Sequence, residues 1–189
     1  MIRLLSILFM TTLSFSAQAA DFGIEAGVRS QSGDTPASSG LTTVSRTNFE
    51  LGGVGQFPLS GAFQIRSGLK YSQRSLDLKV VSSSSTGSLT LTYFDIPVQG
   101  LYKFEDYGAV FAGPVVSFIL DKKCDLGNGA TCDLSKAKSL LIPLQIGATF
   151  KFMPQMGATI FYETIPGDVV TDIYTNSRAI GANFLFTFD

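Results

Sequence analysis

Apolar side chains alternate with small, polar or charged side chains through most of the chain, and helical spacing of apolar positions is missing after about the first twenty residues. In segment 22–29, Phe22 and Ile24 lie on one face of a strand, whereas Glu25 and Arg29 lie on the other. The segment at 109–120 is apolar on both sides, so the pattern does not assign its faces. We predict eight β-strands, at residues 22–29, 49–57, 63–72, 93–104, 109–120, 142–152, 159–163 and 180–188.

The segments between these strands alternate strictly in length. The long ones are residues 30–40, 82–88, 121–139 and 166–177, and the short ones are residues 58–61, 105–108 and 153–157. Outer-membrane barrels have an even number of strands, an apolar outward face, short periplasmic turns and long extracellular loops. The pattern therefore predicts an all-β chain, folded as an eight-stranded antiparallel up-and-down transmembrane β-barrel with both termini on the periplasmic side.

The first residues have the features of a secretory signal. Arg3 precedes an apolar stretch, and the sequence AQA at 17–19 is a cleavage site of the A-x-A kind. We therefore expect residues 1–19 to be a signal peptide and residues 20–189 to form a single outer-membrane barrel domain. Export of this kind, together with the strand pattern, predicts the outer membrane of a Gram-negative bacterium as the location.

The last predicted strand carries an aromatic side chain at every second position. Phe184, Phe186 and Phe188 share one face, and Asp189 follows the last ring. This arrangement resembles the C-terminal signal by which outer-membrane barrels are recognised by their insertion machinery. We expect these phenylalanines to face lipid, with that machinery as a partner during assembly and with outer-membrane lipid and lipopolysaccharide around the folded barrel.

Residues 93–104, YFDIPVQGLYKF, resemble a strand of the PorT-like outer-membrane β-barrel domain family, in which Tyr, an apolar residue and an acidic residue precede Ile-Pro. Asp95 stands where glutamate is common in that family. The resemblance implies an eight-stranded barrel of the general shape of the OmpA membrane domain and of OmpX. The family has no shared catalytic residues, so the resemblance assigns none to this chain.

Composition removes several classes of function. The chain has no histidine, so neither a Ser-His-Asp nor a Cys-His arrangement can be assembled, and the usual zinc ligand sets are missing. A net charge of −1 gives no basic face for nucleic acid. We therefore predict a protein that is not an enzyme, with no cofactor, no catalytic residue and no metal site.

The face opposite the apolar one carries charges of both signs. They are Glu25, Glu50, Arg66, Lys70, Asp95, Lys151 and Glu163. An eight-stranded barrel is just wide enough for its own side chains to fill the interior. We predict that these residues form a paired polar network that plugs the lumen; the alternative is a narrow charged pore.

The two cysteines, Cys124 and Cys132, lie in one predicted long loop. In an oxidising compartment they should form a disulfide. The alternatives are a thiol redox switch or a metal site that uses Asp125 and Asp133.

The alternation changes phase in one predicted hairpin. Apolar residues are odd-numbered through 63–71 but even-numbered at Leu76 and Leu78, and the partner segment changes from odd at Leu89 and Leu91 to even from Phe94. β-Bulges at the membrane rim would explain both changes. We expect residues 75–93 to stand above the lipid and to offer an exposed apolar row to a surface partner or to lipopolysaccharide; the alternative is a long solvated hairpin.

These patterns predict a monomeric integral outer-membrane barrel whose role is structural or adhesive and is carried by its extracellular loops. The alternative is a soluble exported barrel, similar to a lipocalin, that binds an apolar ligand in its lumen. That alternative requires the apolar faces of the strands to point inward. A further alternative is a narrow pore.

Overall fold

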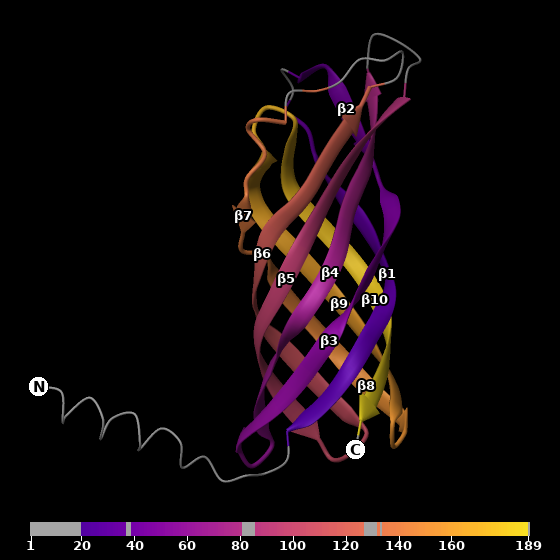
Figure 1. Ribbon diagram of the computed structural model, residues 1–189, viewed down its shortest axis with the longest axis vertical. Coiled ribbons are helices and arrows are strands. Elements are labelled where there is room, and N and C mark those ends of the chain that lie inside the picture. The colour runs from indigo at the N-terminus through magenta and orange to yellow at the C-terminus, as the bar shows by residue number, and fades with distance from the viewer. Residues whose placement is uncertain (1–19, 37–38, 81–85, 127–131, 133, 189) are drawn as a thin grey trace, which may run out of the picture.

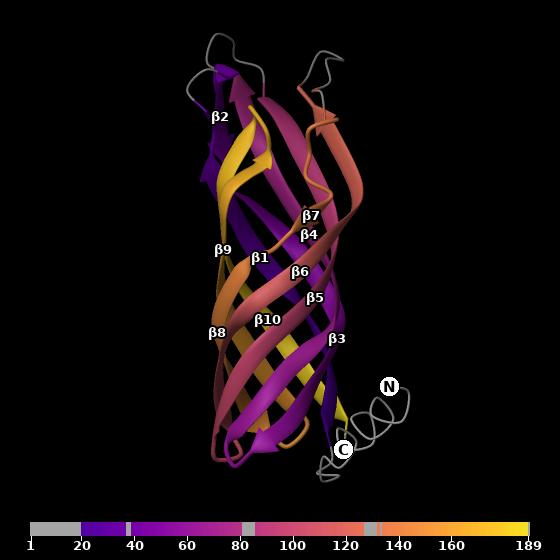
Figure 2. The ribbon, with the colours of Figure 1, turned by 90° about the vertical axis from the view of Figure 1, so that its left-hand side faces the viewer.

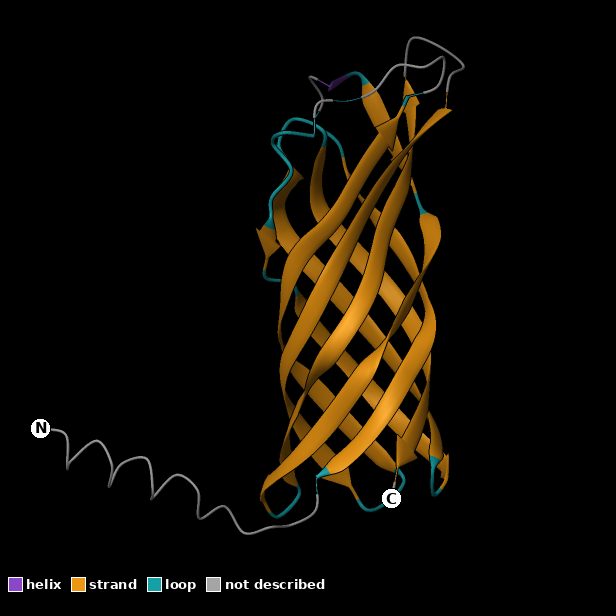
Figure 3. Cartoon of the chain, in the orientation of Figure 1, coloured by secondary structure: helices purple, strands orange, loops and turns teal. Residues whose placement is uncertain are grey.

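The computed structural model describes residues 20–36, 39–80, 86–126, 132 and 134–188, and the chain forms a closed antiparallel barrel (Figures 1 and 3). Its elements are β1 (Asp21–Asp34), β2 (Leu41–Val44), β3 (Arg46–Ser60), β4 (Phe63–Val80), β5 (Thr86–Phe104), β6 (Gly108–Asp125), β7 (Leu140–Leu141), β8 (Leu144–Met153), β9 (Met156–Val170) and β10 (Tyr174–Phe188). β2 with β3, and β7 with β8, each occupy one position in the wall, so the ten elements form the predicted eight-stranded barrel. The predicted signal peptide, residues 1–19, lies outside the described residues and stays a prediction.

Pairing of the first and last strands closes the barrel. β1 pairs with β10 from Phe22 opposite Phe188, and its other edge pairs with β3. β1 begins and β10 ends at the same end of the barrel as the short turns (Figure 1). The strands extend beyond their predicted limits into the segments expected to be loops, as far as residue 34 in β1, 125 in β6 and 170 in β9. Within the described residues, no helix is long and apolar enough to cross a membrane.

The apolar faces of the strands point outward, as lipid contact requires. Phe22, Phe63 and Phe188 are all more than half exposed. Neighbouring rings pack edge to face on this outer surface, for example Phe63 and Tyr102, whose centroids are 5.0 Å apart. We call this outward surface the apolar band. The lipocalin-like alternative is wrong, because it required the same side chains to line the lumen.

The structure assigns the faces of the strand that the sequence left open. In β6, Ala109 and Phe111 point into the barrel and are buried, whereas Val110 and Phe118 are exposed on the outside. Phe111 packs inside with Phe161 of β9. Aromatic rings therefore contribute to the filling of the lumen as well as to the apolar band.

The predicted bulges in the hairpin of β4 and β5 are wrong. Their ladder runs from Phe63 opposite Tyr102 to Lys79 opposite Thr86 without a register shift. The inward face therefore stays the same, and the side chains on it change from polar to apolar above the membrane. Leucines expected to form an exposed row are instead fully buried in the barrel: Leu76, Leu78, Leu89 and Leu91.

The outer face of the same strands changes in the opposite sense. Beyond the apolar band, β4 and β5 present polar side chains such as Asp77, Lys79 and Thr90. The polarity of the wall is thus inverted where the strands leave lipid for water. We call the part beyond this level the extension: residues 75–80 of β4, 86–93 of β5, 121–125 of β6 and 166–178 of β9, β10 and their turn.

Candidate functional site

The lumen within the apolar band contains a network of buried charged side chains. Its acids are Glu25, Glu50, Asp95 and Glu163, and its bases are Arg29, Arg66, Lys70 and Arg74. The formal charges of four acids and four bases cancel. The structure therefore brings together six of the seven lumen residues expected from the sequence and adds two arginines.

At the periplasmic end of the network, Arg66 of β4 contacts Glu25 of β1. Its Nη2 donates to both carboxylate oxygens of Glu25, at 2.7 and 2.6 Å. Thr159 donates a further hydrogen bond to Glu25, at 2.9 Å. The Arg66 guanidinium lies 4.4 Å from the centroid of the Phe111 ring, within the range of a cation–π contact.

Lys70 connects this first pair to the next carboxylate. Its Nζ donates to Glu50 and lies 3.6 Å from Glu25 Oε2. Asn183 of β10 also donates to Glu50, at 2.6 Å. Glu50 is therefore held from two sides of the barrel.

The upper part of the network is built around Arg29 and Arg74. Arg29 donates to Glu163 and lies 3.4 Å from Glu50. Arg74 donates to both oxygens of Asp95, at 3.1 and 3.0 Å, and lies 3.2 Å from Glu163. The contacts thus form one continuous chain of alternating charge, in which each partner offsets the desolvation of another.

Lys151 lies apart from the network. It is half-buried near the β8–β9 turn, in a small recess that Gln56 and Thr149 also line. Among the described residues, the ion pairs of the network do not include it. Its position next to the periplasmic turn explains this, because the network lies deeper in the barrel.

Arg29 and Arg74 are the members that sequence reasoning missed. Alternation did place Arg29 on the inner face of its strand, but a period of two does not identify a partner on another strand. Arg74 continues the even-numbered inward series of Arg66 and Lys70. The assumed bulge hid this signal, because it would have moved the inward face at that point.

The C-terminal phenylalanines lie where lipid contact was expected. Phe184, Phe186 and Phe188 all point outward, and the rings of Phe186 and Phe188 pack edge to face at 5.4 Å. Their role as an assembly signal stays a prediction.

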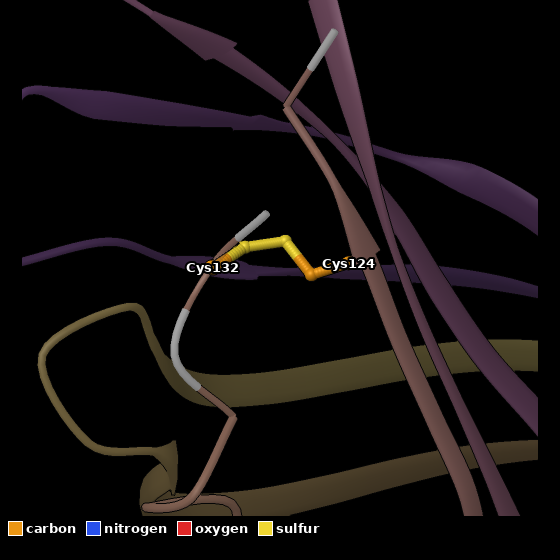
Figure 4. Close-up of a disulfide and its surroundings, with 2 residues drawn as sticks. All are labelled: Cys124 and Cys132. Carbon is orange, nitrogen blue, oxygen red and sulfur yellow. A yellow bond between two sulfur atoms is a disulfide. The ribbon is translucent and has the colours of Figure 1, made fainter. Parts of the chain in front are cut away.

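A disulfide joins Cys124, at the end of β6, to Cys132 (Figure 4). The Cα atoms are 5.6 Å apart, which is an ordinary separation for a disulfide. The metal alternative used Asp125 and Asp133, and Asp133 lies outside the described residues. Within the described part of the chain, no group of three or more acidic or cysteine side chains could hold a metal ion.

We expect both cysteines to be oxidised in the protein purified from membranes. Alkylation without reductant should then leave the intact mass unchanged, whereas alkylation after reduction should add the mass of two labels. Closing so short a loop is worth about 2–3 kcal/mol on the chain-entropy estimate. Label uptake without reductant would contradict the pairing.

A closed barrel with an apolar outer band and a charged interior defines the class of integral outer-membrane β-barrels. The chain belongs to the family described as outer membrane protein beta-barrel domain, which it matches over residues 7–164. It therefore lies in the bacterial outer membrane. No curated protein matches the chain.

Solved structures share this fold at low identity. Ail of Yersinia pestis, in complex with the heparin analogue sucrose octasulfate, is 12% identical with a TM-score of 0.53, and the match covers 89% of this chain and 100% of Ail. Neisserial surface protein A is 17% identical with a TM-score of 0.53, and the match covers 90% of this chain and 100% of that protein. At these identities the two structures show the fold alone.

Proposed function

We propose that this barrel is a non-enzymatic protein of structure or surface contact, with a lumen closed to solutes and with its contacts made by the extension and extracellular loops. The observation that carries the proposal is the inversion of polarity along the wall. Below the inversion the outer face suits lipid, and above it the same strands present a polar surface to the outside. A barrel that served only as a membrane anchor would not need strands of this length.

The pairing of charges inside the barrel supports a closed lumen. A narrow charged pore needs groups that can exchange partners with a passing ion. Here each charge of the network lies against an opposite charge, as Arg66 lies against Glu25 and Arg74 lies against Asp95. We propose that these pairs plug the barrel within the membrane.

The charges around the extension also pair with one another, which favours contact with a polar partner of low charge. Arg46 lies 3.2 Å from Asp77, and Lys136 lies 2.8 Å from Asp172. A strongly anionic partner would have to compete with these aspartates. For this reason we do not extend to this chain the binding of a heparin analogue by Ail.

The remaining expectations belong to the same proposal. They are a monomeric barrel, PorT-like ancestry suggested by residues 93–104, surrounding lipid and lipopolysaccharide, and assembly by the insertion machinery through the C-terminal strand. Contact through residues 75–93 would use polar side chains such as Lys79 and Thr86, because the leucines of this hairpin are buried.

An adhesion assay tests the surface-contact role. The double substitution Thr42→Glu and Thr86→Glu, which we call the extension variant, adds two negative charges at exposed positions on either side of Lys79. Thr86 belongs to the extension, and Thr42 belongs to β2, which pairs with it. Cells that produce this variant should adhere to surfaces and to one another only as well as cells without the protein, because the added charges must be desolvated in any contact.

The matched control is Ser60→Glu with Gln155→Glu, which adds the same charge at exposed positions of periplasmic turns. It should adhere like the unchanged protein. Both variants should reach the membrane and retain the heat-dependent electrophoretic shift of a folded barrel. Equal adhesion by the extension variant, the control variant and cells without the protein would contradict a surface-contact role.

A further inference from the structure

An apolar cluster fills the barrel directly above the charged network. Its buried members are Leu76, Leu78, Leu89, Leu91, Tyr93, Cys124, Ala137, Leu141, Ile165, Val169, Val170 and Tyr174. Eight of the twelve are completely inaccessible to solvent: Leu76, Leu78, Leu89, Leu91, Tyr93, Val169, Val170 and Tyr174. Most of its members belong to the extension, where the strands have left the membrane, and Ala137, Leu141 and Ile165 adjoin it.

The members of the cluster come from opposite walls of the barrel. Leu76 and Leu89 belong to β4 and β5, whereas Val169 and Tyr174 belong to the β9–β10 side. Leu41, next to β4, packs against the same cluster. Because these side chains meet in the middle, the cluster spans the lumen rather than lining one wall.

Two tyrosines form the boundary between the apolar cluster and the polar network. The Tyr93 ring lies 4.8 Å from the Arg74 guanidinium carbon. The Tyr174 hydroxyl donates to the backbone oxygen of Ser32, at 3.2 Å, and accepts a hydrogen bond from Gln31, at 3.1 Å. Each tyrosine thus presents a ring to the apolar side and lies against polar groups below.

The wall around this cluster is completed by one segment that is irregular except for the two-residue strand β7. Within the described residues, no ladder joins β6 directly to β9, and residues 134–143, which we call the strap, fill the space between them (Figure 2 faces this part of the wall). The strap is bonded to β6 by Ile119 N–H to Ser139 O, at 2.9 Å, and to β9 by Lys138 N–H to Val169 O, at 3.1 Å.

The inner side of the strap belongs to the cluster. Ala137 and Leu141 are buried there, and Leu134 packs against it. The Cys124–Cys132 disulfide ties the chain just before the strap to the end of β6. Removal of the strap would therefore both open the wall and uncover the leucines.

We infer that this apolar cluster is a septum that closes the extracellular mouth of the barrel to ions, independently of the ion pairs below it, and that the tethered strap holds it closed. An ion that enters apolar surroundings loses its hydration without a replacement partner. Hydrophobic constrictions block conduction in this way even without charged groups. The polar network and the septum are thus two seals in series, and the inference does not depend on the surface-contact role.

A set of four proteins in planar lipid bilayers tests the septum. They are the unchanged full chain, a network variant (Arg66→Ala with Arg74→Ala), a septum variant (Leu76→Ser with Leu89→Ser) and the combination of both variants. The network variant alone should stay at the baseline current, because the septum remains. The combination should pass a current roughly tenfold or more above baseline, since both barriers are removed.

Current in the network variant alone, equal to that of the combination, would overturn the inference. A combination as tight as the unchanged protein would overturn it as well. Current in the septum variant alone would support the septum and would show that the ion pairs contribute no barrier of their own.

A labelling experiment covers variants that fold poorly. Ser117 is buried between the network and the septum and lies 3.3 Å from Arg74. A cysteine placed there by Ser117→Cys should resist a charged, membrane-impermeant thiol reagent added to intact cells. The same cysteine should react when Leu76→Ser and Leu89→Ser are added, and also when Cys124→Ser and Cys132→Ser release the strap. Rapid labelling with the septum and disulfide intact would overturn the inference.

Discussion

Replacing Arg74 with alanine should lower the free energy of unfolding of the barrel by about 3–5 kcal/mol, the range for removal of one partner of a buried ion pair. Arg74 is fully buried and donates to Asp95 and Glu163. Glu163 keeps Arg29 as a partner, whereas the donors that remain to Asp95 among the described residues are neutral, such as Ser72 at 2.6 Å. The measurement is urea-induced unfolding in detergent or lipid, in which the heat-dependent electrophoretic shift reports the fraction of folded barrel.

The exposed pair of Arg46 and Asp77 provides a matched control. Their N–O distance is 3.2 Å, but their side chains are 45% and 38% exposed. Arg46→Ala should therefore change the free energy of unfolding by about 1 kcal/mol or less.

Adding Asp95→Asn to Arg74→Ala should recover part of the loss, because the unpaired charge is removed. Equal effects of Arg74→Ala and Arg46→Ala on the free energy of unfolding would contradict the prediction that a buried ion pair of the network matters more for stability than an exposed one.

The strand pattern of this chain could be predicted because lipid and lumen impose opposite demands on alternate residues. Phe161 is an example of this alternation. Its neighbours Ile160 and Tyr162 occupy the outward positions, so Phe161 lies on the inward face although it is aromatic. Six of the seven predicted lumen residues meet in one network for the same reason. Alternation assigns a face, and a narrow barrel brings the side chains on its inner face within reach of one another.

Partners across the barrel could not be predicted from the same pattern. Arg29 and Glu163 are separated by 134 residues, and their contact depends on the register of every ladder between them. Lys151 was expected on the inward face of its strand but lies outside the network. Alternation assigns a face of the strand and does not predict the position of a residue along the barrel axis.

The alternation in the hairpin of β4 and β5 predicts bulges that the structure does not contain, and the reason is physical. Its leucines stay on the inward face, but the solvent outside the wall changes from lipid to water. Apolar side chains therefore occupy the outward positions within lipid and the inward positions above it, although the β4–β5 ladder has no register shift. In sequence, this exchange of environments has the same pattern as a bulge. Only the unbroken ladder separates the two explanations.

Replacing Gly181 with valine should lower the free energy of unfolding by about 3 kcal/mol, the upper part of the range for overpacking. Gly181 lies on the inner face of β10, directly opposite Phe161 in the ladder. A Cβ atom at this position would lie 2.2 Å from Cζ of the Phe161 ring. The ring is buried and lies near the cations of Arg29 and Lys70, so it cannot move aside without disturbing the network.

Two companion variants assign this effect to the ring. Gly53→Val makes the same substitution on the outward face, where the nearest atom to a new Cβ is the Gly23 oxygen at 3.9 Å, and it should change stability by about 0.5 kcal/mol or less. In a Phe161→Ala background, Gly181→Val should have little further effect, because the clashing ring is absent. If Gly181→Val were equally destabilising in that background, the glycine would be required by the backbone of β10. If the effect disappeared with the ring, the glycine would be explained by the aromatic side chain that fills the lumen across from it.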